Sequence, residues 1–451
     1  MKTSFSNAKQ YIAQLKSIEQ QINQNQLQDA ATQLNRLAKT SSHDPRIFLL
    51  GARLAEAAGN PEGMLQAARK ACQLAPDWPT ASIYLAGVLA GRGDAEEAIV
   101  MAAQALHQAS NDIELLIQAA AVAQRLSLHE QTLQWLRQAE QIKPGDVGIR
   151  YKIGLTLIAS GDPAGAVDVF TELLQQQPAS AVLLSARVQA CLGAKQTEQA
   201  ILDGEVLVAL EPDNEVHPFY LALARGETPA TQPAALVVGL FDGFAARYDK
   251  HWVGQLKYTL PKDVAQMILQ WHPDRKVDVL DLGCGTGLLG LYLGPIEGVM
   301  VGADLSLPMM EQASRHGVYA SFHQVNVLDA LQATPANHYD IITMLDVLNY
   351  VGSLEPVMVN ALRILTPGGR FVFSCEAGAE IKTRSKAKAK VQPGYALPAT
   401  LRYTHLRSYV QRLLDEAGFE DVVLEDRVLR TEANEPVQGF LVTARKPALA
   451  T

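Results

Sequence analysis

Small residues and helix breakers in the first half of the chain recur with a period of 34 residues. Four prolines and one serine form the first column of this pattern: Pro76, Ser110, Pro144, Pro178 and Pro212. Small side chains form two more columns, the second of them interrupted by Met64 and Thr132: Ala71, Ala105 and Ala139, and Ala30, Ala98, Ala166 and Ala200. A further column holds Gly59, Gly93 and Gly161. The period predicts stacked helix pairs, because small residues let helices cross closely and proline ends the second helix of each pair.

The pattern changes after residues 226–233, GETPATQP, where prolines and small polar residues interrupt the helical spacing. Beyond this segment, short apolar strands alternate with amphipathic helices, which is typical of a mostly parallel sheet. We therefore predict an all-α repeat array in residues 1–225, a linker in 226–233 and an α/β domain in 234–447. The array is expected to hold about six helix pairs over residues 11–212 and to end in a capping helix near 216–225.

The composition restricts the partners and the location that we expect. A formal net charge of −8 over 451 residues argues against nucleic acid, which is bound mainly through basic surface. No apolar run reaches the ~18 residues of a membrane helix, and the N-terminus lacks the apolar core of a secretory signal. The four cysteines lack metal-ligand spacing: Cys72, Cys191, Cys284 and Cys375. We expect free thiols, no metal site, no membrane partner and a cytoplasmic location.

A glycine-rich turn in the second half carries the strongest chemical signal. The apolar strand predicted for Val277–Leu282 leads into LGCGTG and then into a helix. Glycines there allow a tight turn and let the backbone approach a bound cofactor. Residues 285–290 also fit the dinucleotide pattern G-x-G-x-x-G, and Asp304 lies 19 residues after Gly285, where a ribose-binding acid is expected. A nicotinamide enzyme is therefore one interpretation of this hexapeptide.

Three other segments favour a different cofactor. Asp281, two residues before the first glycine, completes LDLGCGTG, which resembles motif I of the class I S-adenosylmethionine-dependent methyltransferases. YDIITMLDVLNYV at 339–351 and LRILTPGGRFVFSCE at 362–376 resemble the fourth and fifth strands of that family. Two further segments, 422–432 and 436–446, resemble its closing strand pair. The resemblance implies a Rossmann-like, mostly parallel seven-stranded sheet that binds S-adenosylmethionine.

The repeat half resembles the tetratricopeptide family in spacing, although the large aromatic residue near the start of each unit is absent. Two further motifs resemble a bacterial family that joins such repeats to a class I methyltransferase. These motifs are FDGFAARYD at 241–249 and Arg402-Tyr403-Thr-His405. The order of the two domains agrees with that family.

The resemblance implies a set of cofactor-binding residues. The expected set is Tyr248, Asp281, Gly283, Cys284, Gly285, Gly287, Asp304, Leu305, Met309, Asn326, Val327 and Asp346. Asp304 would accept hydrogen bonds from the ribose hydroxyls, although it could instead cap the helix that follows, a task that Ser306 could also perform. Leu305 and Met309 would pack against the adenine. Asn326 and the backbone of Val327 would meet the adenine edge, with Asp329 as a rival for that role.

The methionine end of the cofactor and the acceptor involve other side chains. Asp281 would organise the glycine turn and face the ammonium group, and Tyr248 would close over the methionine end. Asp346 would orient the substrate or contact that ammonium group, and His405 would touch the substrate. Asp346, Glu376 and His405 are all candidates for a general base, and the sequence does not choose among them. The basic segment 382–390 is either a solvated tip or a contact for an acidic acceptor.

Three functions are compatible with these features. The first is methylation of a protein or peptide held in the groove of the repeats. The second is methylation of a small molecule, with the repeats serving assembly. The third is an interaction protein that holds the cofactor without catalysis. Groove positions expected from the period are Arg46, Arg53, Thr80, Gly87, Ala121, Gln124, Tyr151 and Gln189. The acceptor and the oligomeric state are not predictable from the sequence.

Overall fold

The structure is a computed structural model that describes residues 2–242, 257–379, 394–432 and 435–448. The chain divides into two compact units, residues 1–203 and 204–451. The division falls inside a helix, upstream of the boundary expected near 226. The domain limits of 1–225 and 234–447 therefore stay a prediction. Across the described residues, no helix combines the length and apolarity needed to cross a lipid bilayer.

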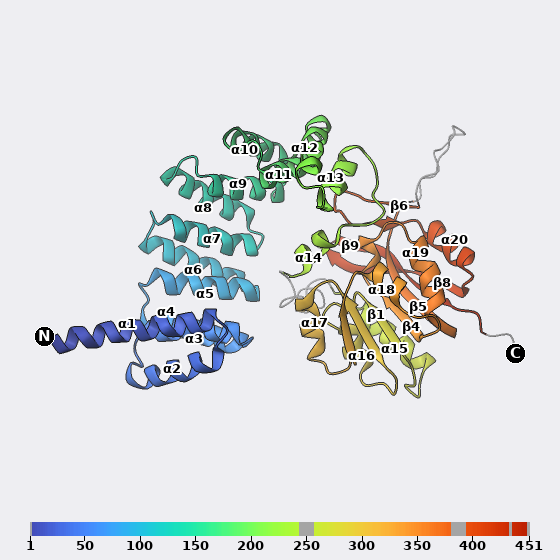
Figure 1. The fold of residues 1–451 in the computed structure, drawn as a ribbon, viewed down its shortest axis with the longest axis horizontal. Helices are drawn as coiled ribbons and strands as arrows, with labels where there is room; N and C mark the ends of the chain where they lie inside the picture. Colours follow the sequence, from blue (N-terminus) through green and yellow to red (C-terminus); the bar gives the residue numbers. More distant parts are fainter. Residues whose placement is uncertain (1, 243–256, 380–393, 433–434, 449–451) are drawn as a thin grey trace. The chain divides into compact units, whose positions relative to one another are not determined.

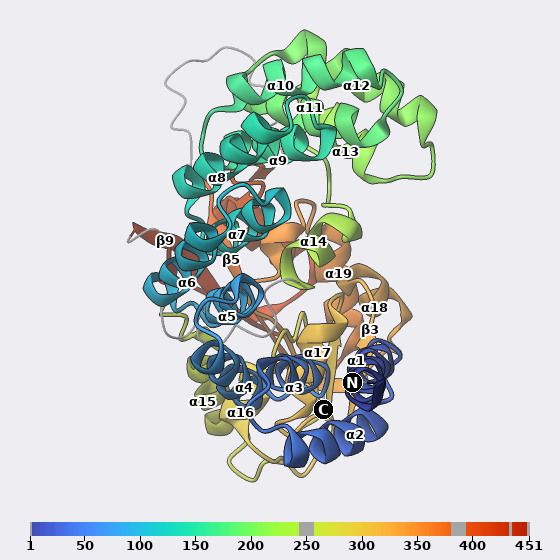
Figure 2. The same ribbon diagram turned by 90° about the vertical axis from the view of Figure 1, so that its left-hand side faces the viewer.

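Six helix pairs follow one another along the repeats, as Figures 1 and 2 show. The pairs are α1 Lys2–Asn23 with α2 Leu27–Thr40, α3 Pro45–Ala57 with α4 Pro61–Leu74, α5 Pro79–Arg92 with α6 Ala95–Gln108, α7 Ile113–Arg125 with α8 His129–Ile142, α9 Val147–Ala159 with α10 Pro163–Gln176, and α11 Ala181–Gly193 with α12 Thr197–Leu210. Helix α13, Val216–Ala224, follows them. The odd-numbered helices from α3 onward begin at residues 45, 79, 113, 147 and 181, which confirms the period of 34.

The small-residue columns lie where the helices of each pair cross. All seven alanines of the two columns are fully buried, at 0% exposure. Because an alanine leaves room for a neighbouring backbone, these positions permit the close crossing that the period predicts. Larger apolar residues such as Phe170 and Leu173 are also completely buried, and the Phe170 ring of α10 packs against Tyr151 of its partner helix α9.

The turn inside each helix pair has a left-handed residue at the same position of every unit. The six residues have φ between 58° and 85°: Asn25, Gly59, Gly93, Ser127, Gly161 and Lys195. The glycine column in the sequence therefore marks a backbone requirement, because a residue without Cβ adopts this conformation without strain. Asn25, Ser127 and Lys195 meet the same requirement with a side chain present.

The second unit is built on a mixed sheet whose described part has nine strands. The strands are β1 Val279–Leu282, β2 Met300–Asp304, β3 Ser321–Gln324, β4 Tyr339–Met344, β5 Leu365–Ala377, β6 Tyr395–Ala396, β7 Thr404–His405, β8 Glu420–Glu432 and β9 Glu435–Arg445. Seven of them form the order β3-β2-β1-β4-β5-β9-β8, in which β9 runs antiparallel to both neighbours. The predicted seven-stranded sheet is present, and the two-residue strands β6 and β7 extend it from the end of β5.

Helices cover both faces of this sheet (Figure 1). The helices of this part of the chain are α14 Ala234–Asp242, α15 Leu260–Trp271, α16 Leu288–Leu293, α17 Leu307–Ser314, α18 Val327–Ala333, α19 Glu355–Ile364 and α20 Arg407–Ala417, with a 3-10 turn at Leu348–Tyr350. Buried residues of α18, α19 and α20 pack on one face, and those of α15 and α16 on the other. The central strand β1 is accordingly buried along its whole length.

The segment expected to be a linker, residues 226–233, is hydrogen-bonded to the rest of this second unit. The backbone oxygen of Ala230 accepts hydrogen bonds from the N–H groups of Gly352 and Ser353, both at 2.9 Å. The Tyr403 hydroxyl donates to the oxygen of Pro229 at 2.8 Å. Gln232 donates through its backbone to Tyr350 and through its side chain to Leu401. The prolines interrupt the helices as predicted, but the segment then follows the edge of the α/β unit.

Candidate functional site

A pocket lies at the carboxyl ends of strands β1, β2, β3 and β4. It is lined by Thr231, Gln232, Val237, Phe241, Gly283, Gly285, Asp304, Leu305, Met309, Asn326, Val327, Leu345, Asp346, Val347, Tyr350 and Val351. Parallel strands end together at one edge of the sheet, and open α/β sheets bind their ligands there. Eight of the predicted site residues meet in this pocket: Gly283, Gly285, Asp304, Leu305, Met309, Asn326, Val327 and Asp346.

The glycine turn is shaped by two different steric needs. Gly283 has φ 71°, and a Cβ there would lie 2.2 Å from Cγ2 of Val347, so no side chain fits. Gly285 also has a left-handed φ, 52°, but a Cβ on it would meet nothing within 4 Å. Because Gly285 lines the pocket, that empty space is open to a ligand. The turn thus offers bare backbone on the side where a cofactor would lie.

Asp304 joins the end of β2 to the glycine turn. Its Oδ2 accepts a hydrogen bond from the N–H of Gly285 at 2.8 Å, and its Oδ1 accepts one from the N–H of Ser306 at 2.9 Å. Ser306, and not Asp304, caps α17, because its hydroxyl accepts from the N–H of Met309. Burial raises the pKa of Asp304, and the backbone donors of Ser306 and Gly285 act in the opposite direction. The carboxylate is therefore placed beside the glycine turn, with lone pairs left for a ligand.

The predicted adenine side of the pocket is apolar with one amide. Leu305 and Met309 line it, as do Asn326 and Val327. The side-chain oxygen of Asn326 is already used, because it accepts from the N–H of Leu328 at 2.9 Å and begins α18. Asp329, the rival, lines an adjoining pocket instead.

Asp281 and two residues of the glycine turn lie outside the pocket lining. The carboxylate of Asp281 accepts from the Tyr319 hydroxyl and from the Thr343 hydroxyl, each at 2.7 Å. Burial raises its pKa to about 6. Asp281 therefore connects β1 to β4 and to Tyr319, two residues before β3. Cys284 is buried, and Gly287 begins α16.

Asp346 belongs to a buried ionic cluster that the sequence analysis missed. Arg430, which is 0% exposed, donates to Oδ1 of Asp346 at 2.6 Å, to Glu432 at 2.7 Å and to Glu376. Arg402 pairs with Glu376 and Glu432 in addition. Three carboxylates thus surround two guanidinium groups at the ends of β4, β5 and β8. Arg430 and Glu432 lie two positions apart on β8, so their side chains point to the same face of the strand. This spacing was the feature of the sequence that could have predicted the cluster.

The environment of Asp346 is unusual in backbone and in charge. Its φ is 59°, and its N–H donates to the hydroxyl of Ser374 at 2.8 Å. Burial raises the pKa of Asp346 to about 6, although the Arg430 guanidinium acts to lower it and Glu376 acts to raise it further. A buried carboxyl group whose pKa is raised in this way is a candidate for acid–base chemistry.

His405 is not among the residues that line the pocket. Its ring is completely buried, and Nε2 lies 2.9 Å from the oxygen of Val351 and 3.1 Å from that of Gly352. Burial lowers its pKa to about 4, so the ring is neutral near pH 7. These contacts fit a residue that fixes β7 to the turn after β4. Tyr248 and the basic segment 382–390 lie outside the described residues.

One wall of the pocket comes from the segment between the two predicted domains. Thr231, Gln232, Val237 and Phe241 line it. The Phe241 ring meets the Tyr350 ring edge to face, with centroids 5.6 Å apart, and Asp242 accepts from the Ser306 hydroxyl at 2.7 Å. Nothing in the spacing of GETPATQP indicates this role. Among the described residues, no three His, Cys, Asp or Glu side chains gather closely enough to hold a metal ion.

Comparisons with known proteins concern mainly this second unit. Residues 252–424 match a family described as "Methyltransferase domain". The chain is 27% identical over 184 residues to a S-adenosyl-L-methionine-dependent Diels-Alderase of Talaromyces variabilis, covering 38% of this chain and 62% of the relative. It is 28% identical over 233 residues to a ubiquinone biosynthesis O-methyltransferase of Thiobacillus denitrificans, covering 47% of this chain and 97% of the relative.

Among the solved structures that are similar to the chain, one resembles the repeat half. It is the protein YrrB, described as a TPR protein with an unusual peptide-binding site. The identity is 19%, the TM-score is 0.35, and the match covers 43% of this chain and 97% of that one. The repeat assignment therefore depends on the helix pairs and their 34-residue period. The second unit carries the glycine turn, the sheet order and the sequence match together, and it contains a methyltransferase domain of the S-adenosylmethionine-dependent kind.

Proposed function

We propose that this protein transfers a methyl group from S-adenosylmethionine to a protein or peptide that its repeats recruit. One observation carries the first part of the proposal. The open backbone at Gly285 lies beside the carboxylate of Asp304 in a single pocket. A pyrophosphate would be repelled by two carboxylates in that pocket, Asp304 and Asp346, whereas a cationic cofactor would not.

The residues of the pocket fit S-adenosylmethionine along its length. Asp304 would accept hydrogen bonds from the ribose hydroxyls, since its carboxylate keeps acceptor capacity after bonding to the backbone. Leu305 and Met309 would contact the adenine, and Asn326 with Val327 would lie at its edge. Asp281 is not available to the methionine end, because its carboxylate already accepts hydrogen bonds from Tyr319 and Thr343.

Asp346 is our candidate for the base that prepares the acceptor. When bound, the cofactor supplies an activated methyl group on its sulfonium, so the protein mainly aligns the acceptor and removes its proton. Arg430 fixes Oδ1 of Asp346, and within the described part of the chain no side chain donates to Oδ2. That oxygen can accept the proton of a hydroxyl or amine acceptor. Because burial raises the pKa of Asp346 to about 6, the carboxylate suits this proton transfer near neutral pH.

Calorimetry and a product assay test the catalytic part. Titration with S-adenosylmethionine should give one binding site per chain, and labelled methyl should then appear on an acceptor together with free S-adenosylhomocysteine. Binding without release of S-adenosylhomocysteine in the presence of any acceptor would favour the non-catalytic alternative. The relative described as a Diels-Alderase shows that a S-adenosylmethionine-dependent protein is not always named for methyl transfer.

The repeats separate the two catalytic alternatives. A protein acceptor can be captured on the repeats, methylated in the presence of labelled cofactor and identified. The same acceptor is then offered to residues 196–451, which keep α12 and the fastened segment 229–233. If recruitment is correct, the fragment keeps its kcat on a small acceptor but shows a greatly raised KM on the protein acceptor. Equal rates for both enzymes on the protein acceptor would mean that the repeats serve assembly.

A small-molecule acceptor is the second candidate. This candidate is favoured by the similarity to a relative named for ubiquinone biosynthesis. The match covers 97% of that relative's length. The pocket wall contributed by Phe241 and Tyr350 is aromatic, and a flat phenolic acceptor would stack there. Methylation of a simple catechol at a rate unaffected by removing residues 1–195 would support this candidate.

A further inference from the structure

The residue before each repeat helix forms a column with one exception. The column contains Asp44, Trp78, Asp112, Asp146 and Ser180, spaced by 34 residues. Four of these side chains accept a hydrogen bond from a backbone N–H of the helix they precede, those of Arg46, Leu115, Ile149 and Leu183 respectively. Trp78 precedes α5 and makes no such bond. An indole offers only a donor, so it cannot cap a helix N-terminus.

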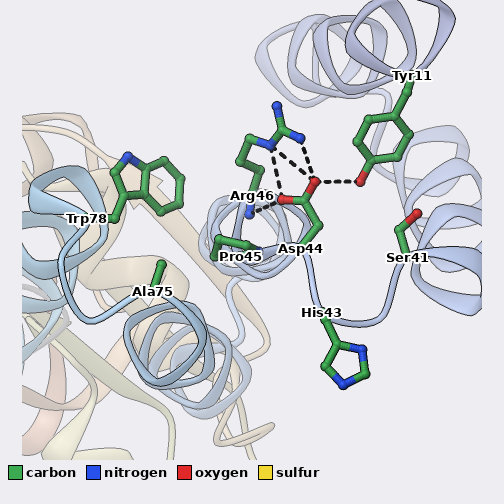
Figure 3. A pocket seen from close by; sticks show the side chains of 8 residues that line it. All are labelled: Tyr11, Ser41, His43, Asp44, Pro45, Arg46, Ala75 and Trp78. Atoms are coloured by element: carbon green, nitrogen blue, oxygen red, sulfur yellow. Dashed lines mark hydrogen bonds and ion pairs between the residues drawn. The ribbon is translucent and has the colours of Figure 1, made fainter. Parts of the chain in front are cut away.

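The exception coincides with a hollow in the first repeats. Trp78 lines it together with Tyr11, Ser41, His43, Asp44, Pro45, Arg46 and Ala75. Figure 3 shows Trp78 on one side and Tyr11 on the other, with Arg46 and Asp44 between them. Positions that break a local rule of the fold tend to be retained for function, because the lost stability needs a compensating gain. The indole is therefore placed for contact with a ligand.

Hydrogen bonds within the hollow use both oxygens of Asp44, so no acceptor on this carboxylate is left for a ligand. Oδ1 of Asp44 accepts from the backbone N–H and the Nε of Arg46 at 2.9 and 3.0 Å. Oδ2 accepts from Nη2 of Arg46 at 2.6 Å and from the Tyr11 hydroxyl at 2.8 Å. These four bonds use the acceptor capacity of a carboxylate. The Arg46 guanidinium also lies over the Tyr11 ring, 5.5 Å from its centroid, which holds it in place.

Donors that line the hollow make no hydrogen bond with an acceptor among the described residues. They include Nη1 of Arg46 and the indole N–H of Trp78. The Arg46 side chain is 48% exposed, so its free edge is reachable. Beside these donors, the Pro45 ring, the Ala75 methyl group and the indole face form an apolar surface. A ligand that fits must bring hydrogen-bond acceptors next to an apolar group.

We propose that this hollow binds an acidic side chain of a peptide together with a neighbouring proline or aliphatic residue. The carboxylate would accept from Arg46 and Trp78, and the apolar neighbour would lie on the indole and Pro45. The peptide would belong to the acceptor protein, so this inference rests on the proposed recruitment by the repeats. It assigns the recognition to the first three repeats.

Selection from a random peptide library tests the assignment. A phage-displayed library of 12-residue peptides is panned on the full chain, and enriched sequences are synthesised with amidated C-termini and measured by fluorescence polarisation. We expect enriched peptides to share an acidic residue next to a proline or aliphatic residue. The Trp78→Ser variant restores a capping side chain and should bind these peptides at least tenfold more weakly. Its repeat melting temperature should rise by about 2–4 °C, the usual effect of one added cap at this size.

Asp112→Ala is the matched control, because Asp112 caps α7 by the same contact and does not line the hollow. It should lower the melting temperature by a similar amount and leave peptide binding within twofold of wild type. The inference is wrong if no acidic sequence is enriched, if Trp78→Ser binds as wild type does, or if Trp78→Ser both melts lower and loses binding. Failure of the proposed function is seen separately, as peptide binding that persists without methylation of any captured protein.

Discussion

Arg430 on β8 donates a hydrogen bond of 2.6 Å to Asp346 at the end of β4, across 84 residues of sequence. The Arg430 side chain is 0% exposed and that of Asp346 5%, so the pair is shielded from water. Removing one member of a buried ion pair leaves the other charge without a partner, which is more costly than the pair is worth. The contact therefore keeps one oxygen of Asp346 fixed while the residue lines the pocket at the strand ends.

Asp346→Asn should abolish the increase in the rate of methyl transfer that occurs as pH rises. The wild-type rate is expected to increase as pH rises through about 6, because Asp346 must lose its proton to act as a base. The variant should lose roughly 10²–10⁴-fold in kcat for a hydroxyl or amine acceptor. Glu432→Gln is the control, since it removes a carboxylate of the same cluster that does not line the pocket. An unchanged pH profile in Asp346→Asn would exclude Asp346 as the base.

Asp304→Ala should weaken the binding of S-adenosylmethionine by ~1.5–3 kcal/mol, because charged hydrogen bonds to the ribose are lost. Titration calorimetry measures the change directly. Asp329→Ala serves as the comparison, because Asp329 lies in the adjoining pocket and is the rival of Asn326. If the Asp329 variant weakens binding and the Asp304 variant does not, the cofactor lies elsewhere than we propose.

Gly285→Val should abolish cofactor binding, and Gly285→Ala should already weaken it. A Cβ at Gly285 would enter the open space of the pocket, at a backbone φ of 52° that strains any side chain. Gly317→Ala separates the two effects, because Gly317 has φ 66° and open space around it but does not line the pocket. Gly285→Ala and Gly317→Ala should each lower the free energy of unfolding by ~1 kcal/mol. Only the Gly285 variants should lose the rise in melting temperature that added cofactor gives.

His405→Gln should change how stability depends on pH while leaving methyl transfer within a few-fold of wild type. The folded pKa of His405 is about 4, below its ordinary 6.5, so only the unfolded chain takes up this proton between those values. Its contribution is complete above pH 6.5 and is lost as pH falls toward 4. Denaturant unfolding should be measured at several pH values between 4 and 6.5. The slope of the free energy of unfolding against pH should be smaller in the variant by ~1.4 kcal/mol per pH unit. A large loss of kcat at pH 8 would instead place His405 in the reaction.

Lys195→Gly should stabilise the repeats by ~1 kcal/mol. Lys195 has φ 60° at the turn position where three other repeats have glycine. Glycine removes the steric cost of the left-handed backbone, which exceeds its larger entropy in the unfolded chain. Ala194→Gly is the neighbouring control, because Ala194 has φ −80° and should be destabilised by the change. Equal effects of the two substitutions on the free energy of unfolding would contradict the explanation of the glycine column.

Much of the fold could be predicted because its signals are local or periodic. Helix pairs that start every 34 residues repeat the same packing requirement, so the alanine and glycine columns mark it in each unit. The turn at Gly283 and Gly285 is encoded by a short segment, and Asp304 follows one strand later. Each of these predictions concerns residues that are close in sequence or are repeated at a fixed interval.

The remaining site was decided by contacts between distant segments. Arg430 meets Asp346 only because β8 closes the sheet beyond β9, and Gln232 reaches the pocket only because residues 229–232 follow the edge beside Tyr350. The fold also placed Asp281 beside two hydroxyl groups and His405 among backbone carbonyls, positions that the motifs did not distinguish from a ligand-binding role. A sequence determines what each side chain can do chemically, and its local pattern determines the elements. Which side chains face a ligand depends on how those elements pack, because burial and partners change with every neighbour.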